Sequence, residues 1–226
     1  MVYSNLREII IVLKKEILTG ARFKGAFLTM LMFSVTTLSL ISLILQGAVL
    51  ESGALSAAFW TIIFFSAGVS VDRLFMEEEF SGTIKLLRIY GAPCAVLFGK
   101  TLYGFILLAA LSLFTSFLFI AFFDINFTLN TAKMFFANLI VGAAGLATSG
   151  AFLAALSASA KVKSGLFPVL MLPITLPILL LSANITSILF DGGYAEISSL
   201  APIFLYDMIL AVVASILFDY VWYEDI

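Results

Sequence analysis

Histidine is absent from this 226-residue sequence, and cysteine occurs only once. Without histidine the chain lacks the commonest metal ligand, the usual general base and the usual axial ligand of haem iron. Cys94 has no second cysteine with which to form a disulfide within the chain. The phosphate-binding motif GxxxxGK[ST] is missing too. We therefore expect the chain to hydrolyse no nucleotide by itself.

Charged residues are scarce as well. They make up 12% of the chain, about half of the fraction that is usual in soluble domains. Hydrophobic residues make up 62%, the mean hydropathy is +1.16, and 23 residues are Phe. A water-soluble fold cannot bury so much apolar surface, so the sequence predicts an integral membrane protein. Because spanning helices satisfy all their backbone groups internally, we expect an all-α fold with one domain over residues 1–226.

Six apolar segments follow an amphipathic beginning. Each reaches roughly the 20 residues that a helix needs to cross ~30 Å of hydrocarbon. They cover residues 26–50, 54–71, 101–123, 132–159, 164–190 and 198–221. The fifth contains Pro168, Pro173 and Pro177, which predict a kinked helix, since each proline removes an amide donor and clashes with the preceding turn. The kinks fit either a packing accommodation or a hinge.

Residues 1–24 form the predicted amphipathic helix. Tyr3, Leu6, Ile10, Leu13 and Ile17 recur at spacings of three and four, which places them on one face. Charges at 14–16 interrupt the apolar run and no cleavage site follows it, so the pattern is not that of a cleavable signal. The helix is expected to lie in the headgroup layer. The same helix could also brace a soluble partner.

Lysine and arginine gather on one side of the predicted spans. Eleven of the twelve lie in residues 1–24 and in the second and fourth connections, and only Lys133, at the beginning of the fourth segment, lies on the other side. The positive-inside rule then places both termini in the cytoplasm, in a multi-pass membrane protein.

Residues 72–93, DRLFMEEEFSGTIKLLRIYGAP, form a charged connection on the predicted cytoplasmic side. Gly82 is expected to interrupt the outgoing helix, and Ser81 or Thr83 to cap a short helix that ends at Gly91. Pro93 suits the first turn of the next span. The short helix carries an apolar stripe between charges, which fits docking into a groove of a partner. A solvated linker whose apolar residues dip into the headgroups fits the composition equally well.

Several of these residues also carry a family resemblance. The series Glu79, Gly82, Thr83, Ile84 and Leu87, followed by Pro93 and by Lys100 at the opening of the next span, resembles the corresponding connection of ABC-2-type transporter permeases. With LPITLP at 172–177 and six spans in 226 residues, the whole chain is similar to the haem exporter protein B (CcmB) family of cytochrome c maturation. One departure is the single proline of GAPCAVL, where the family pattern implies a proline-richer turn.

The resemblance implies a non-catalytic permease subunit of the bacterial inner membrane. This subunit would pair with a separate ABC ATPase, which holds the ATP, and with a second copy of itself. Other cytochrome c maturation membrane proteins and a haem chaperone are further implied partners, and nucleic acid is not. The short helix would be the coupling helix. The implied ATPase interface comprises Glu77, Glu78, Glu79, Ser81, Gly82, Thr83, Ile84, Leu86, Leu87 and Tyr90. Its exposed glutamates would orient the partner, because such ion pairs contribute only ~0–1 kcal/mol each, while the apolar residues supply the buried contact.

Haem could be handled by the complex, either by passage through the permease or by release of a loaded chaperone on the outer side. With no histidine, a haem contact in this chain would need Tyr, Met or an apolar cleft. We therefore favour a mechanical role and expect this chain to bind no cofactor or metal. The alternatives are an ABC-2 permease for another substrate, a secondary transporter or a structural membrane scaffold. A secondary transporter usually carries paired broken helices, and only the fifth segment is interrupted.

A few residues within the spans leave two interpretations open. Asp207 fits either an intramembrane site or the outer interface, and Asn184 with Thr186 fits either a polar path or a helix–helix hydrogen bond. The resemblance to ABC-2 permeases suggests short re-entrant helices within residues 185–203. Small residues of the fourth span predict a close-packing face: Gly142, Gly145, Ala147, Gly150 and Ala154.

Overall fold

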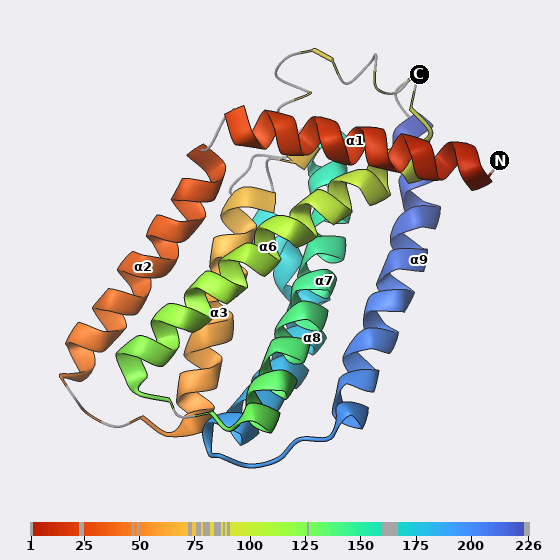
Figure 1. Cartoon of the computed structure of the whole chain (residues 1–226). Helices are drawn as coiled ribbons and strands as arrows, with labels where there is room; N and C mark the ends of the chain where they lie inside the picture. Colours follow the sequence, from red (N-terminus) through yellow and green to blue (C-terminus); the bar gives the residue numbers. More distant parts are fainter. Residues whose placement is uncertain are drawn as a thin grey trace.

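A computed structural model of the chain describes residues 2–22, 25–46, 48, 50–71, 74, 75, 78, 82, 83, 87, 89, 91–125, 127–159 and 167–223. All regular structure in these residues is helical, which confirms the predicted all-α membrane fold. In chain order the elements are α1 (Val2–Arg22), α2 (Gly25–Leu45), α3 (Ser52–Val71), α6 (Pro93–Phe123), α7 (Leu129–Ser159), α8 (Phe167–Phe190), the 3-10 helix η2 (Ile197–Leu200) and α9 (Ala201–Tyr223) (Figure 1).

The six apolar segments coincide with α2, α3, α6, α7, α8 and α9. Five of these helices are long and apolar enough to cross a membrane, and α3 is a shorter apolar helix within the described residues. Three differences from expectation stand out. Helix α2 ends at Leu45, five residues earlier than predicted. Helix α6 begins at Pro93, eight residues earlier than predicted, and the residues expected to form a separate re-entrant helix at 185–190 are the last turns of α8. Pro168 is the second residue of α8, so only Pro173 and Pro177 lie inside the helix.

Helix α1 lies across one end of the bundle, transverse to the spans (Figure 1). The beginning of α6 and the end of α9 lie at this end, which we call the α1 end. The connections that follow α2, α6 and α8 lie at the opposite end. The bundle therefore has one end covered by a helix and one end closed by turns.

Helix α7 is the centre of the packing and contacts α6, α8 and α9. Its small residues let neighbouring groups come close: a Cβ on Gly142 would overlap the Trp60 ring, and a Cβ on Gly150 would lie 2.5 Å from Val71 Cγ1. Ala147 and Ala154 are fully buried. The predicted close-packing face is confirmed, as expected where van der Waals contact between helices replaces the hydrophobic drive of water.

Candidate functional site

Four charged side chains meet at the α1 end and form a closed ring, which we call the ion ring: Lys15, Glu16, Glu78 and Lys100. Lys100 Nζ lies 2.9 Å from Glu16 Oε1 and 2.8 Å from Glu78 Oε1. Lys15 Nζ lies 3.0 Å from the same Glu16 oxygen and also bonds Glu78 Oε1. Oε1 of each glutamate thus accepts from both lysines, and the ring is neutral overall.

Lys100 is the most deeply buried member, with none of its surface exposed. A lysine ammonium has three donors, and here they go to the two glutamates and to the carbonyl oxygen of Leu74. The Phe75 ring lies under the ammonium, with its centroid 4.8 Å from Nζ, which adds a cation–π contact. A buried charge is tolerated when it is paired and its donors are satisfied, and Lys100 meets both conditions.

The ring shifts the protonation equilibria of Lys15 and Glu78 toward the charged forms. Burial opposes ionisation of Glu78, but the charges and hydrogen bonds of Lys100 and Lys15 outweigh it and lower the pKa of Glu78. Burial likewise disfavours the charged form of Lys15, while hydrogen bonding and charge from Glu78 and Glu16 raise the pKa of Lys15. Both groups are therefore ionised at neutral pH.

Helix α1 docks on α6 along a face built from residues four apart: Glu8, Val12, Glu16 and Gly20. Residues four apart share one helix face, so a single stripe of α1 makes these contacts. At one end of the stripe, Glu8 Oε2 accepts a hydrogen bond of 3.4 Å from the backbone N–H of Ala92, the N-cap residue of α6. A carboxylate is favourable there because the helix N-terminus carries partial positive charge.

Close approach in the middle of the stripe depends on glycine. A Cβ on Gly99 of α6 would lie 2.7 Å from Val12 Cβ and 3.2 Å from the carbonyl oxygen of Ile9. Further along, Gly20 of α1 approaches the Tyr103 hydroxyl so closely that a Cβ would overlap it. The two backbones are therefore near enough for Glu16 to reach Lys100.

The apolar face predicted for α1 is not the face that packs on α6. Leu6, Ile10 and Ile17 are exposed and run beside the docked stripe, and the side chain of Tyr3 lies outside the described residues. The amphipathic helix itself is confirmed, as α1. Its place in the headgroup layer stays a prediction.

The structure describes four of the ten predicted interface residues: Glu78, Gly82, Thr83 and Leu87. The other six lie outside the described residues: Glu77, Glu79, Ser81, Ile84, Leu86 and Tyr90. Gly82 has φ +69°, which fits the predicted interruption. Leu87 N donates to Thr83 O at 3.0 Å and Gly91 N donates to Leu87 O at 2.9 Å, bonds of the helical i to i−4 type.

The exposure of these residues corrects one expectation. Glu78 was expected to face a partner, but it is 5% exposed and bonds inside the chain, because Lys100 and Lys15 offer it charged donors within reach. Leu87 is half-buried and packs against the core. Ile89, which sequence reasoning did not single out, is 71% exposed and is thus an apolar side chain that the described part of this segment presents outward.

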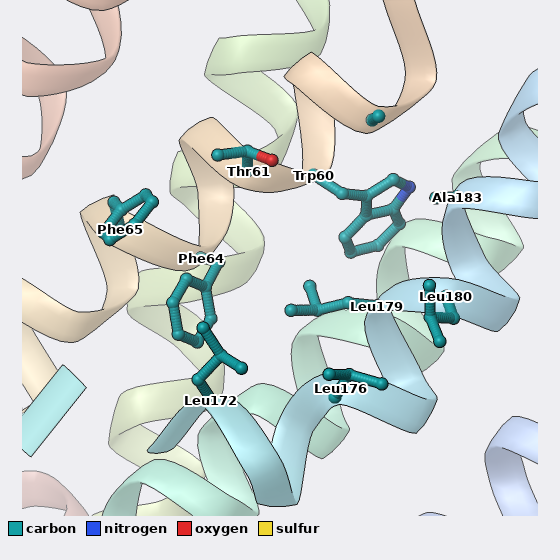
Figure 2. Close-up of a pocket in the computed structure, with 10 residues that line it drawn as sticks. Trp60, Thr61, Phe64, Phe65, Leu172, Leu176, Leu179, Leu180 and Ala183 are labelled. Carbon is teal, nitrogen blue, oxygen red and sulfur yellow. The ribbon is translucent and has the colours of Figure 1, made fainter. Parts of the chain in front are cut away.

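An apolar groove with a volume of about 350 Å³ lies between α3 and α8 (Figure 2). Thr61 supplies the one hydroxyl among its lining residues, which are Ala57, Trp60, Thr61, Phe64, Phe65, Leu172, Leu176, Leu179, Leu180 and Ala183. None of these side chains is a Tyr, Met, Cys or His. The lining therefore offers apolar contact without an axial ligand for haem iron.

Buried hydrogen bonds fix the position of Trp60, which lines this groove. Trp60 Nε1 donates to Thr186 Oγ1 at 2.9 Å, and Asn138 Nδ2 of α7 donates to the same oxygen at 3.1 Å and to Ser182 O at 3.0 Å. Of the two interpretations left open for Thr186, the helix–helix hydrogen bond is the one present, whereas Asn184 is exposed. These bonds connect α3, α7 and α8 in a region where water offers no alternative partner.

Comparison with known proteins identifies one family. No curated protein matches the chain. The family model described as CcmB protein matches residues 7–219, which include most of α1, the ion ring, the groove and most of α9. The chain therefore belongs to the CcmB family and is a multi-pass membrane component of an ABC-type haem exporter that acts in cytochrome c maturation.

Proposed function

We propose that this chain is the permease subunit that receives movement from a separate ABC ATPase at the α1 end and transmits it to the spans. The observation that carries this proposal is the ion ring. It binds Glu78, in the connection between α3 and α6, both to α6 through Lys100 and to α1 through Lys15. A displacement of that connection is passed to α6 and α1 together.

The strength of the ring makes it suitable for this transmission. Separating its members is unfavourable because it leaves buried charges unpaired, and removal of one partner from a buried ion pair costs ~3–5 kcal/mol for this reason. Lys100 also donates to the carbonyl oxygen of Leu74, so the part of the connection that follows α3 is bonded to the ring as well. Pushing residues 72–93 therefore moves the ring as one unit and tilts the long helix α6.

The α1 end faces the cytoplasm in this proposal, with both termini on that side of the bacterial inner membrane. Arg7, Lys14 and Arg22 are exposed on α1, whereas Lys133 is exposed near the beginning of α7, at the opposite end. This distribution supports the orientation that the positive-inside rule gives. In a Cys94→Ser background, we expect the variant Lys14→Cys to be labelled from the cytoplasmic side only.

In this proposal the movement drives haem export, or the release of a haem-loaded chaperone on the outer side. The complex that carries it out contains two permease copies and two ATPase copies. ATP binds to the ATPase subunits. Because the sequence has no histidine and the groove lining has no iron ligand, we assign this chain a mechanical role without a cofactor of its own.

The first test is co-purification of the chain with the ABC ATPase of the same pathway. Ile89→Asp is expected to reduce the bound ATPase about tenfold, since loss of one buried apolar anchor costs ~1–2 kcal/mol. Gly82→Pro should act likewise, because proline cannot adopt φ +69°. Ile197→Asp is the matched control, an isoleucine that is 80% exposed at the opposite end. Wild-type amounts of ATPase with Ile89→Asp and Gly82→Pro would contradict the proposed interface.

The second test separates binding from transmission. Glu78→Gln alters the ring behind the interface, so the ATPase should still co-purify while the stimulation of its hydrolysis by this chain falls. Unchanged stimulation in Glu78→Gln would show that the ring transmits nothing. A chain that binds no ATPase at all would favour a secondary transporter or a scaffold.

A further inference from the structure

Asp207 is an acidic side chain inside a membrane-spanning helix. It is the seventh residue of α9 (Ala201–Tyr223), within the candidate span Ile197–Tyr220. Its carboxyl group points at α7, where it fills the notch left by Gly145: a Cβ on that glycine would overlap Asp207 Oδ1 and lie 2.6 Å from Ile178 Cδ1 of α8. The carboxyl group is thus inserted between three helices and away from the lipid.

Neither oxygen of this carboxyl group is accessible, and neither has a hydrogen-bond partner within the part of the chain that the structure describes. The neighbouring Tyr206 hydroxyl donates instead to Ile174 O at 2.8 Å. A carboxylate held this way would be a buried charge without a counter-ion, which is strongly unfavourable in hydrocarbon.

The helices packed against α9 supply no cation to offset such a charge. Helix α8 and η2 contain no ionisable side chain, and the one in α7 is Lys133, which is exposed near the beginning of that helix. In α6 the ionisable groups are Cys94, Lys100 and Tyr103. Lys100 belongs to the ion ring, and its three donors are already used there.

We propose that Asp207 is a proton-binding site inside the membrane, and that α9 packs on α7 with this side chain as the neutral carboxylic acid. The ligand is a proton, which binds one carboxylate oxygen and leaves again to water or to a diffusible base. Loss of the proton from Asp207 places an unpaired negative charge against the backbone at Gly145. Protonation thereby controls the contact between α9 and α7. This inference stands on α7, α8 and α9 and does not depend on the ATPase interface.

Infrared spectroscopy of the purified full-length chain in lipid tests the proposal. A carboxylic acid has a C=O stretching band well separated from carboxylate bands, and this band shifts when H2O is replaced by D2O. At neutral pH we expect such a band in the wild type, its loss in Asp207→Asn, and its retention in Asp219→Asn. Asp219 is the matched control, since it lies on the same helix but is exposed.

Isotope labelling provides a second measurement without any substitution. Aspartate labelled with ¹³C at its side-chain carboxyl should shift the acid band of the wild type, and exchange in D2O should be slow because both oxygens are buried. If the labelled chain shows no aspartic-acid band at neutral pH, or if Asp219→Asn removes the band and Asp207→Asn leaves it, the proton site is not at Asp207.

Discussion

Replacing Lys100 by methionine should be one of the most damaging conservative changes available in this chain. Methionine resembles the lysine stem in length and keeps the contact with Phe75, so the change removes the ammonium and little volume. Glu16 and Glu78, each 5% exposed, are then left with Lys15 as the remaining cation of the ring. The net charge of the ring goes from zero to −1, and the Leu74 carbonyl loses its donor from Lys100.

The expected size of the effect follows from this geometry. Removal of one partner from a buried ion pair costs ~3–5 kcal/mol, because the charges that remain stay desolvated. Adding Glu78→Gln to Lys100→Met restores neutrality, since Lys15 and Glu16 still pair at 3.0 Å. The double variant should therefore be more stable than Lys100→Met alone, with a coupling of about 0.5–3 kcal/mol.

The assay is unfolding in mixed micelles with increasing SDS, followed by tryptophan fluorescence. Trp222 is a suitable reporter, because its ring lies 5.1 Å from Phe218, which in turn lies 5.9 Å from Phe75 under the Lys100 ammonium. Lys133→Met is the matched control, since it removes an exposed lysine at the opposite end, and it should change the free energy of unfolding by less than ~0.5 kcal/mol. Additive effects of Lys100→Met and Glu78→Gln would refute the ring as an energetic unit.

Three further predictions concern the same framework. Gly99→Ala places a Cβ 2.7 Å from Val12, so it should destabilise the chain by about 1–3 kcal/mol and increase protease cleavage of α1. The contribution of the ring should be constant from pH 5 to pH 10. In acid this contribution is lost as the pH falls below the ordinary Glu pKa of 4.5 and through the lowered pKa of Glu78. In base it is lost as the pH rises above the ordinary Lys pKa of 10.5 and through the raised pKa of Lys15. The difference in unfolding free energy between the wild type and Glu78→Gln, measured across pH, checks this prediction. Thr186→Val removes the acceptor of an indole and an amide N–H, so unfolding in SDS should become easier by about 1–2 kcal/mol.

The spans could be predicted from the sequence because the requirement that creates them is local. A helix that crosses hydrocarbon must be apolar over about 20 residues whatever it packs against, so residues 132–159 predicted α7 within three residues at one end. The beginning of α6 was harder. Residues 93–100 contain a lysine in an apolar run, and the position of a charge marks the membrane boundary only when that charge is exposed.

The ion ring could not be predicted from the sequence because each of its charges has an ordinary local explanation. From the sequence, Lys100 is interpreted as the residue that opens a span and Glu78 as one of three exposed acids. Glu16 is interpreted as part of a polar helix face. Their pairing depends on α1 crossing α6, which joins residues 84 positions apart. One signal was available: Glu8, Val12, Glu16 and Gly20 share a helix face in which two acids sit between small or apolar residues.

Ionisable groups are buried in two contrasting ways among the residues that the structure describes, and this difference separates the roles of the ion ring and of Asp207. In the ion ring, each lysine Nζ lies within hydrogen-bond distance of two glutamate oxygens, which favours the charged forms of Lys15 and Glu78 and makes the contact stiff. Asp207 has no such partner among the described residues, so the neutral form is the one that the packed helices can accommodate. A stiff charged contact suits the transmission of movement, whereas a group that must exchange a proton suits a controllable contact. A substitution that introduces a cation beside Asp207, such as Ile178→Lys, should accordingly convert it to a carboxylate and remove its acid band.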